Sequence, residues 1–134
     1  TFSIDDKELD FAETVTYRGM MFTGVPNMVW IFGYFRASWT LRVDIISDFV
    51  CRLLNHMKKT GMNSIVPALR PEDSEMPRLP WLDTENFNPG YMTRSMHLLP
   101  KRGDKPEWQH TQDYWSERQE LPEIDLEDPI FKYN

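Results

Sequence analysis

Two neighbouring runs, Met20–Asn27 (MMFTGVPN) and Gly33–Leu41 (GYFRASWTL), decide how the first half of this chain folds. Between them stands a continuous apolar run, Met28–Phe32, which predicts a strand covered on both faces. Gly33 ends that strand and lets the backbone approach a neighbouring group closely. The predicted order is therefore strand, turn, strand, turn, helix. The helix begins at the kind of position where open α/β sheets bind ligands.

A long amphipathic helix is predicted after the second run. Arg42 lies off its apolar stripe or at the edge. Ser38 or Thr40 can cap its start, and Gly61 stands where a left-handed residue ends a helix. The apolar stripe consists of Leu41, Ile45, Ile46, Phe49, Val50, Leu53, Leu54 and Met57.

Short strands are predicted before this helix. The Asp5-Asp6 pair supplies the turn of a hairpin between Ile4 and Leu9. Thr14–Thr16 is β-branched and predicts a strand, and Gly19–Thr23 predicts its continuation or a second short strand. These strands are too few to cover the apolar stripe of the helix, so we expect missing partners.

Two more helices are predicted later. Asn88 caps the first, which begins at Pro89 and runs to about Leu99. Thr111 caps the second, which carries Tyr114, Trp115 and Arg118 and ends before Pro122. The stretch 124–134 is expected to be irregular.

Nine of the ten prolines fall at or after Pro67, with charged residues between them. Such a segment can wrap a folded body but has little core of its own. The fold class predicted for the isolated chain is therefore α+β. It combines a few short strands, one long amphipathic helix and a proline-rich, partly helical C-terminal wrap.

The composition excludes several functions. A net charge of −6 argues against nucleic-acid binding. No apolar run reaches the roughly 18 residues of a transmembrane helix, and no signal peptide is visible, so we expect a cytoplasmic protein. The single cysteine, Cys51, excludes an internal disulfide and is expected to be a packed, unreactive thiol.

No metal site and no catalytic residue are predicted. His56, His97 and His110 are far apart and have no cysteine or carboxylate at ligand spacing. The acidic residues near the C-terminus are interpreted as a solvated face. They are Glu117, Glu120, Glu123, Asp125, Glu127 and Asp128.

The two runs also resemble a known family. The pattern GMM-x-x-GVPN at residues 19–27, followed by GY-x-x-ASWTL at residues 33–41, is similar to the last part of the FAD domain in class B flavin monooxygenases. Within that class it resembles enzymes of the Baeyer-Villiger and ethionamide-activating type. It extends from about Val15 to about Trp115. Because the chain lacks both G-x-G-x-x-G and the family's F-x-G-x-x-x-H-x-x-x-W, we expect the C-terminal piece of a larger enzyme.

The resemblance implies an FAD- and NADPH-dependent monooxygenase that inserts or transfers one oxygen atom to a ketone or to a sulfur or nitrogen centre. The cofactor carries this chemistry, and the protein supplies positioning and electrostatics. No catalytic role is transferred to Arg36. The residues implied to bind FAD, through backbone N–H groups at the helix start, are Ala37, Ser38, Trp39, Thr40 and Leu41. The isolated chain is expected to be inactive and to bind no cofactor, since it lacks the phosphate-binding glycine turn.

The resemblance also divides the chain in two. Residues 1–61 correspond to the C-terminal strand–helix part of a doubly wound FAD/NAD(P)-binding fold, and residues 62–134 to an extension packed on the parent enzyme. The remainder of that enzyme is then the partner, and exposed apolar surface could also support a homo-oligomer. From the residues alone a second function stays open, a noncatalytic protein-interaction or subunit-contact module. Eight Met, five Trp and the proline-rich wrap could form its surface.

Overall fold

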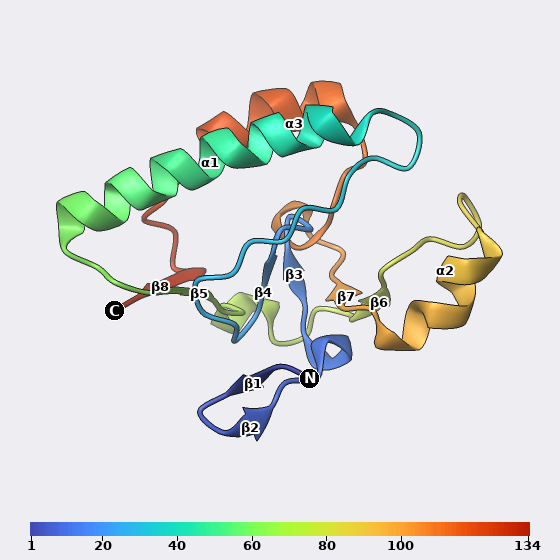
Figure 1. Cartoon of the computed structure of the whole chain (residues 1–134), viewed down its shortest axis with the longest axis horizontal. Coiled ribbons are helices and arrows are strands. Elements are labelled where there is room, and N and C mark those ends of the chain that lie inside the picture. The colour runs from blue at the N-terminus through green and yellow to red at the C-terminus, as the bar shows by residue number, and fades with distance from the viewer.

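Helix α1 (Trp39–Thr60) is the longest element of the computed structural model, which describes residues 1–134 (Figure 1). Ser38 is its N-cap. Gly61 ends the helix in the left-handed region, at φ 71°, and its N–H donates to the carbonyl of Met57. The predicted helix, its start and its glycine stop are confirmed.

The buried face of α1 follows the predicted stripe only in part. Leu54 is 59% exposed, and Cys51 is exposed as well, so the expectation of a packed thiol is wrong. Arg42 is fully buried. At roughly 100° per residue, Arg42 points along the centre of the buried face, whereas Cys51 points to the opposite side. The buried residues of α1 are Arg42, Ile45, Ile46, Phe49, Leu53 and Met57.

The strands are short and form four separate antiparallel pairs. Asp5 and Asp6, at φ 50° and 62°, form the turn of the first pair, which confirms the predicted hairpin. The remaining short helices and strands keep the chain in the α+β class. The pairs are β1 (Ser3–Ile4) with β2 (Lys7–Glu8), β3 (Thr16–Tyr17) with β4 (Met21–Phe22), β5 (Ile65–Pro67) with β8 (Phe131–Tyr133), and β6 (Leu79–Pro80) with β7 (Lys101–Arg102).

The apolar run Met28–Phe32 forms no strand in this chain, which corrects the prediction of a strand covered on both faces. Its side chains divide between two apolar clusters. Val29 packs against the main core, while Trp30 and Phe32 pack against a second cluster around Trp81. An irregular backbone can direct neighbouring side chains to both clusters, and no partner strand is present to hold the run extended.

The two later helices exist, with different caps from those predicted. Helix α2 (Gly90–Ser95) has Pro89 rather than Asn88 as its N-cap. Helix α3 (Tyr114–Glu120) is capped by Asp113, not Thr111. The Asp113 carboxylate accepts from the N–H of Trp115 at 3.1 Å, which satisfies a free donor of the first turn. The 3₁₀ turns are Phe11–Glu13, Pro71–Asp73, Met96–Leu98, Pro106–Trp108 and Leu121–Glu123.

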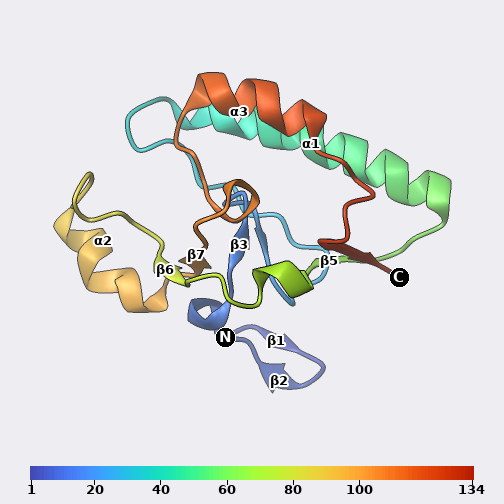
Figure 2. The same ribbon diagram turned by 180° about the vertical axis from the view of Figure 1, so that it is seen from behind.

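The main core lies under α1 and draws on both halves of the chain. The proline-rich half contributes Trp108 and Leu121, and the end of the chain contributes Ile130 and Phe131. Strand β8 pairs with β5 beside α1, so the expectation of an irregular C-terminal stretch is wrong there. Figure 2 shows this pairing from behind, with α3 running alongside α1. The wrap therefore completes the core that buries α1.

Candidate functional site

The five residues predicted to bind FAD lie together where α1 begins. Ala37, Ser38, Trp39 and Thr40 are exposed, and Leu41 is half-buried. The hydroxyl of Ser38 contacts that of Thr40 at 2.7 Å and makes no hydrogen bond to the backbone of the first turn. The first turn contains no acidic residue. The positive end of this 22-residue helix is therefore accessible and has no side-chain cap.

Gly33 confirms the expectation of a close backbone approach, and its neighbour is Trp39. The indole of Trp39 lies directly over Gly33, where any side chain would collide with the ring. The same indole packs against Phe32, with the ring centroids 5.3 Å apart. Half of Trp39 still faces solvent, at 52% exposure. The absence of a side chain at Gly33 thus allows the Trp39 ring to pack at the helix start while it stays half exposed.

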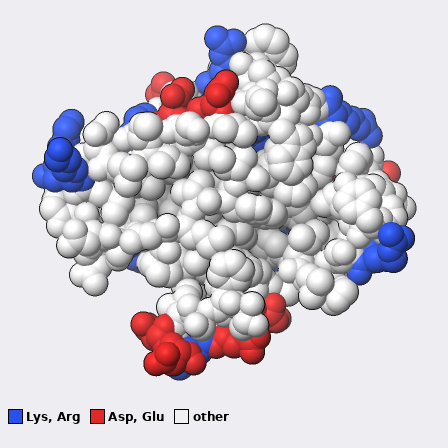
Figure 3. Space-filling view, viewed as in Figure 1, with Lys and Arg blue, Asp and Glu red and all other residues white.

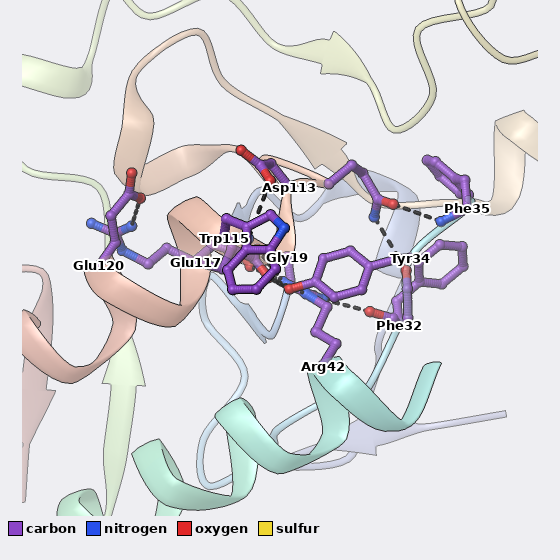
Figure 4. A network of polar contacts seen from close by, with 12 residues as sticks. Gly19, Phe32, Tyr34, Phe35, Arg42, Asp113, Trp115, Glu117 and Glu120 are labelled. Atoms are coloured by element: carbon purple, nitrogen blue, oxygen red, sulfur yellow. Dashed lines mark hydrogen bonds and ion pairs between the residues drawn. The ribbon is translucent and has the colours of Figure 1, made fainter. Parts of the chain in front are cut away.

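A buried ion pair lies one turn into the helix (Figure 4). Arg42 is fully buried, and Glu117 of α3 is 2% exposed. The Arg42 Nε donates to Glu117 Oε2 at 2.9 Å and its Nη2 donates to Oε1 at 3.2 Å, which makes the pair bidentate. The position of Glu117 corrects the interpretation that the whole acidic cluster is solvated.

The remaining donors of Arg42 hold the segments around the helix start. Its guanidinium donates to the carbonyls of Arg18 and Phe32, both at 2.6 Å. Tyr34 donates its hydroxyl proton to Glu117 Oε2 at 2.6 Å, as Figure 4 shows. The pKa of Tyr34 is raised well above its usual range, mainly by burial and then by the neighbouring carboxylate of Glu117. The network therefore fixes the β3–β4 turn, the segment before α1 and helix α3 relative to one another.

The sequence carried a signal for this network. Arg42 stands three, four and seven positions before Ile45, Ile46 and Phe49, which places it on their face of the helix. Within α3, Glu117 stands four positions before the buried Leu121. A charged residue three, four or seven positions from buried apolar residues of the same helix is thus the pattern that predicts a buried ion pair.

Arg36 is exposed and donates to the carbonyl of Asn86 at 2.8 Å, so it holds a loop next to the helix start. No group of three or more His, Cys, Asp or Glu side chains lies close enough together to hold a metal ion. None of the helices has the length and apolar character needed to cross a membrane.

No protein-family model and no solved structure matches the chain. Among curated proteins, it is 46% identical over 109 residues to the FAD-containing monooxygenase EthA of Mycolicibacterium smegmatis, which covers 81% of this chain and 21% of that protein. This chain is related to one segment of the FAD-containing monooxygenases. The EthA of Mycobacterium tuberculosis is 43% identical over 114 residues, 85% of this chain and 22% of that protein.

The similarity extends to a second kind of FAD-binding monooxygenase. The protein named "Probable FAD-binding monooxygenase AlmA" of an Acinetobacter species is 35% identical over 136 residues, 98% of this chain and 26% of that protein. The chain thus spans about a fifth to a quarter of the length of the monooxygenases it matches. The resemblance expected from residues 19–41 is confirmed.

Proposed function

We propose that this chain forms the C-terminal part of the FAD-binding domain in an FAD- and NADPH-dependent class B monooxygenase of the Baeyer-Villiger type. The complete enzyme then has a doubly wound α/β fold and adds one oxygen atom to a ketone or to a sulfur or nitrogen centre. The observation that carries the proposal is the 46% identity to an FAD-containing monooxygenase over 81% of the chain. Residues 1–61 contribute the strand–helix part, and residues 62–134 pack against it.

The start of α1 is the part of this chain that fits a flavin. Reduced flavin gathers negative charge at the pyrimidine edge of its ring, and a helix N-terminus stabilises an anion by about 0.3–2 kcal/mol. Ala37–Leu41 offers such an N-terminus, exposed and without an acidic residue in its first turn. When bound, FAD would supply the oxygen chemistry, with NADPH as the electron donor. The role of this chain is to hold the ring edge through backbone N–H groups.

The run Met28–Phe32 supports the presence of a larger sheet in the complete enzyme. Among its five N–H groups, only that of Trp30 donates a hydrogen bond, to the carbonyl of Met20 at 2.7 Å. An apolar segment with unpaired backbone groups is an edge on which another strand can pair. Figure 3 shows that charged side chains lie mainly at the margins of this view, which leaves a broad uncharged surface between them. The rest of the enzyme would cover this surface.

The phosphate-binding glycines of the cofactor sites would come from residues outside the 134 of this chain. We therefore expect the chain by itself to bind neither FAD nor NADPH and to be inactive. Visible absorption of the purified chain measures this. Flavin bands at one equivalent per chain would contradict the expectation.

The role of the helix start is tested by Ser38→Asp in the complete flavin-loaded enzyme. Aspartate still caps a helix, so folding is largely preserved. Its charge opposes electron uptake by about 1–4 kcal/mol at intermediate dielectric. For a two-electron couple this lowers the flavin midpoint potential by some tens of millivolts. A potential equal to that of a Ser38→Asn control would mean that the flavin lies elsewhere.

The exposed apolar residues favour one alternative, a noncatalytic interaction or subunit-contact module. Trp39, Leu54 and Leu98 are 52%, 59% and 64% exposed. Analytical ultracentrifugation with thermal unfolding separates the two functions. A module is a monodisperse chain that melts cooperatively by itself, whereas part of a larger domain associates through the surface that its domain should cover.

A further inference from the structure

A cavity of about 370 Å³ lies beside the segment before α1 and is lined by none of the residues assigned to the flavin. Its walls are aromatic. Phe35 and Phe87 are stacked, with centroids 4.4 Å apart and an interplanar angle of 18°. The ring centroids of Trp81 and His110 are 4.1 Å apart, with the two rings tilted by 37°. Two planar pairs around one space of this size suit a flat ring.

The charge at the cavity comes from two arginines. Arg36 donates to the carbonyl of Asn86 at 2.8 Å, and Arg102 donates to the carbonyl of Pro80 at 2.9 Å. Neither guanidinium takes part in an ion pair. Each guanidinium is therefore oriented by a hydrogen bond to one carbonyl, and its other N–H groups can donate to a ligand.

The one carboxylate of the lining does not neutralise these cations. Asp83 accepts hydrogen bonds from the backbone N–H of Glu85 and from the side chain of Asn86, within its own turn. Two cations against one anion leave the lining with a net positive charge. The cavity therefore favours an anionic ligand over a cationic one.

His110 adds a neutral wall. Its Nε2 lies 2.9 Å from the carbonyl of Trp81, so this nitrogen carries the proton, and Nδ1 is left as a buried acceptor without a partner. Burial lowers the pKa of His110 to about 4, so the ring is uncharged at neutral pH. The indole N–H of Trp81 is also buried without a partner. Two of the five buried side-chain polar atoms without a partner therefore belong to residues that line this cavity.

We propose that this cavity binds a small planar aromatic anion. The ring of the ligand lies among the two aromatic pairs, and its carboxylate or phosphate accepts hydrogen bonds from the guanidinium groups of Arg36 and Arg102. This is a second binding site, beyond the flavin role proposed for the start of α1. The two proposals rest on different residues and can fail separately.

The test is a titration of the complete ¹⁵N-labelled enzyme, followed by NMR, with benzoate and with phenyl phosphate. Benzyl alcohol controls for the ring alone, and acetate for the charge alone. The expected result is saturable shifts of the Trp81 indole and of the Gln109 and Gln112 side-chain amides, which line the cavity. The proposal is supported if at least one of the two anions binds more than about tenfold more tightly than benzyl alcohol and acetate do. The stronger of the two anions identifies the acid group preferred.

Variants locate the site. Arg36→Gln and Arg102→Gln each remove one charge at the cavity and should weaken the preferred anion by about tenfold, since hydrogen bonds between charged groups are the strong ones. Arg94→Gln is the matched control, an exposed arginine on α2 outside the lining, and should leave binding unchanged. The proposal is overturned by an absence of saturable shifts, by equal binding of benzyl alcohol, or by an equal effect of all three variants. A wild-type-like spectrum of each variant without ligand establishes that it is folded.

Discussion

Glu117→Gln is the sharpest test of how the start of α1 is held. The substitution keeps the shape of the side chain and one acceptor oxygen but removes its negative charge. Arg42 then remains fully buried, bonded only to the carbonyls of Arg18, Gly19 and Phe32 and to an amide. An uncompensated buried charge is destabilising even where its hydrogen bonds survive.

The magnitude follows from the burial of both partners. Breaking a buried pair by removing one charge costs about 3–5 kcal/mol. That is a fifth or more of the free energy of unfolding of a typical domain, about 5–15 kcal/mol. With an m value of about 1–3 kcal/mol/M, the urea midpoint should fall by at least about 1 M. Far-UV circular dichroism during urea unfolding measures it.

Two controls complete the experiment. Glu120→Gln removes the neighbouring carboxylate, which is 44% exposed and pairs with Arg18 at 3.2 Å, and should cost no more than about 1 kcal/mol. The double variant Arg42→Met with Glu117→Leu removes both charges and should recover most of the loss. If Glu117→Gln and Glu120→Gln lowered the midpoint equally, the network would not be what fixes the helix start.

Three further outcomes are expected from the same unfolding assay. Phe49→Ala should cost about 3–5 kcal/mol, because Phe49 is 1% exposed at the centre of the stripe, and an unchanged midpoint would show that the stripe does not face the core. His110, with a pKa lowered to about 4 against an ordinary 6.5, binds protons only in the unfolded chain between these values. Stability should therefore fall as the pH drops from 6.5 to 4, by up to about 3 kcal/mol, and His110→Gln should flatten this dependence; parallel profiles would refute it. Gly33→Ala should cost about 1–3 kcal/mol through its collision with the Trp39 ring, and Trp39→Ala in the same chain should relieve it.

Local signals in the sequence predicted much of the fold. The amphipathic period and Gly61 predicted α1, and the Asp5-Asp6 pair predicted the first hairpin. Both predictions were possible because a helix and a hairpin turn depend on residues that are close together in the chain. The end of the chain was missed for the opposite reason. Strand β8 forms by pairing with β5, which lies far away in the sequence. The acidic segment before β8 has the composition of a loop, so the sequence alone did not predict a strand there.

The resemblance proposes where the candidate site lies, but it does not identify the side chains that hold the helix start. The expectations for the two side chains that hold it were wrong, since Arg42 was predicted to lie off the apolar stripe or at its edge and Glu117 to belong to a solvated acidic face. Charged side chains are seldom buried, and only their register with buried neighbours argues otherwise. In the aromatic cavity Phe35 contacts Phe87, and Trp81 contacts His110. These contacts join distant segments of the chain, so the periodicity of the sequence could not predict them.

The polar network has a consequence for synthesis of the chain. Tyr34 and Arg42 meet a carboxylate that lies 83 and 75 positions later in the sequence. A ribosome adding about 5–20 residues per second needs several seconds to produce Glu117 after Arg42 has been made. Throughout that interval the guanidinium lacks its carboxylate partner, and α1 lacks the core residues Leu121, Ile130 and Phe131. The core that buries α1 therefore cannot be completed until translation has passed α3 and β8.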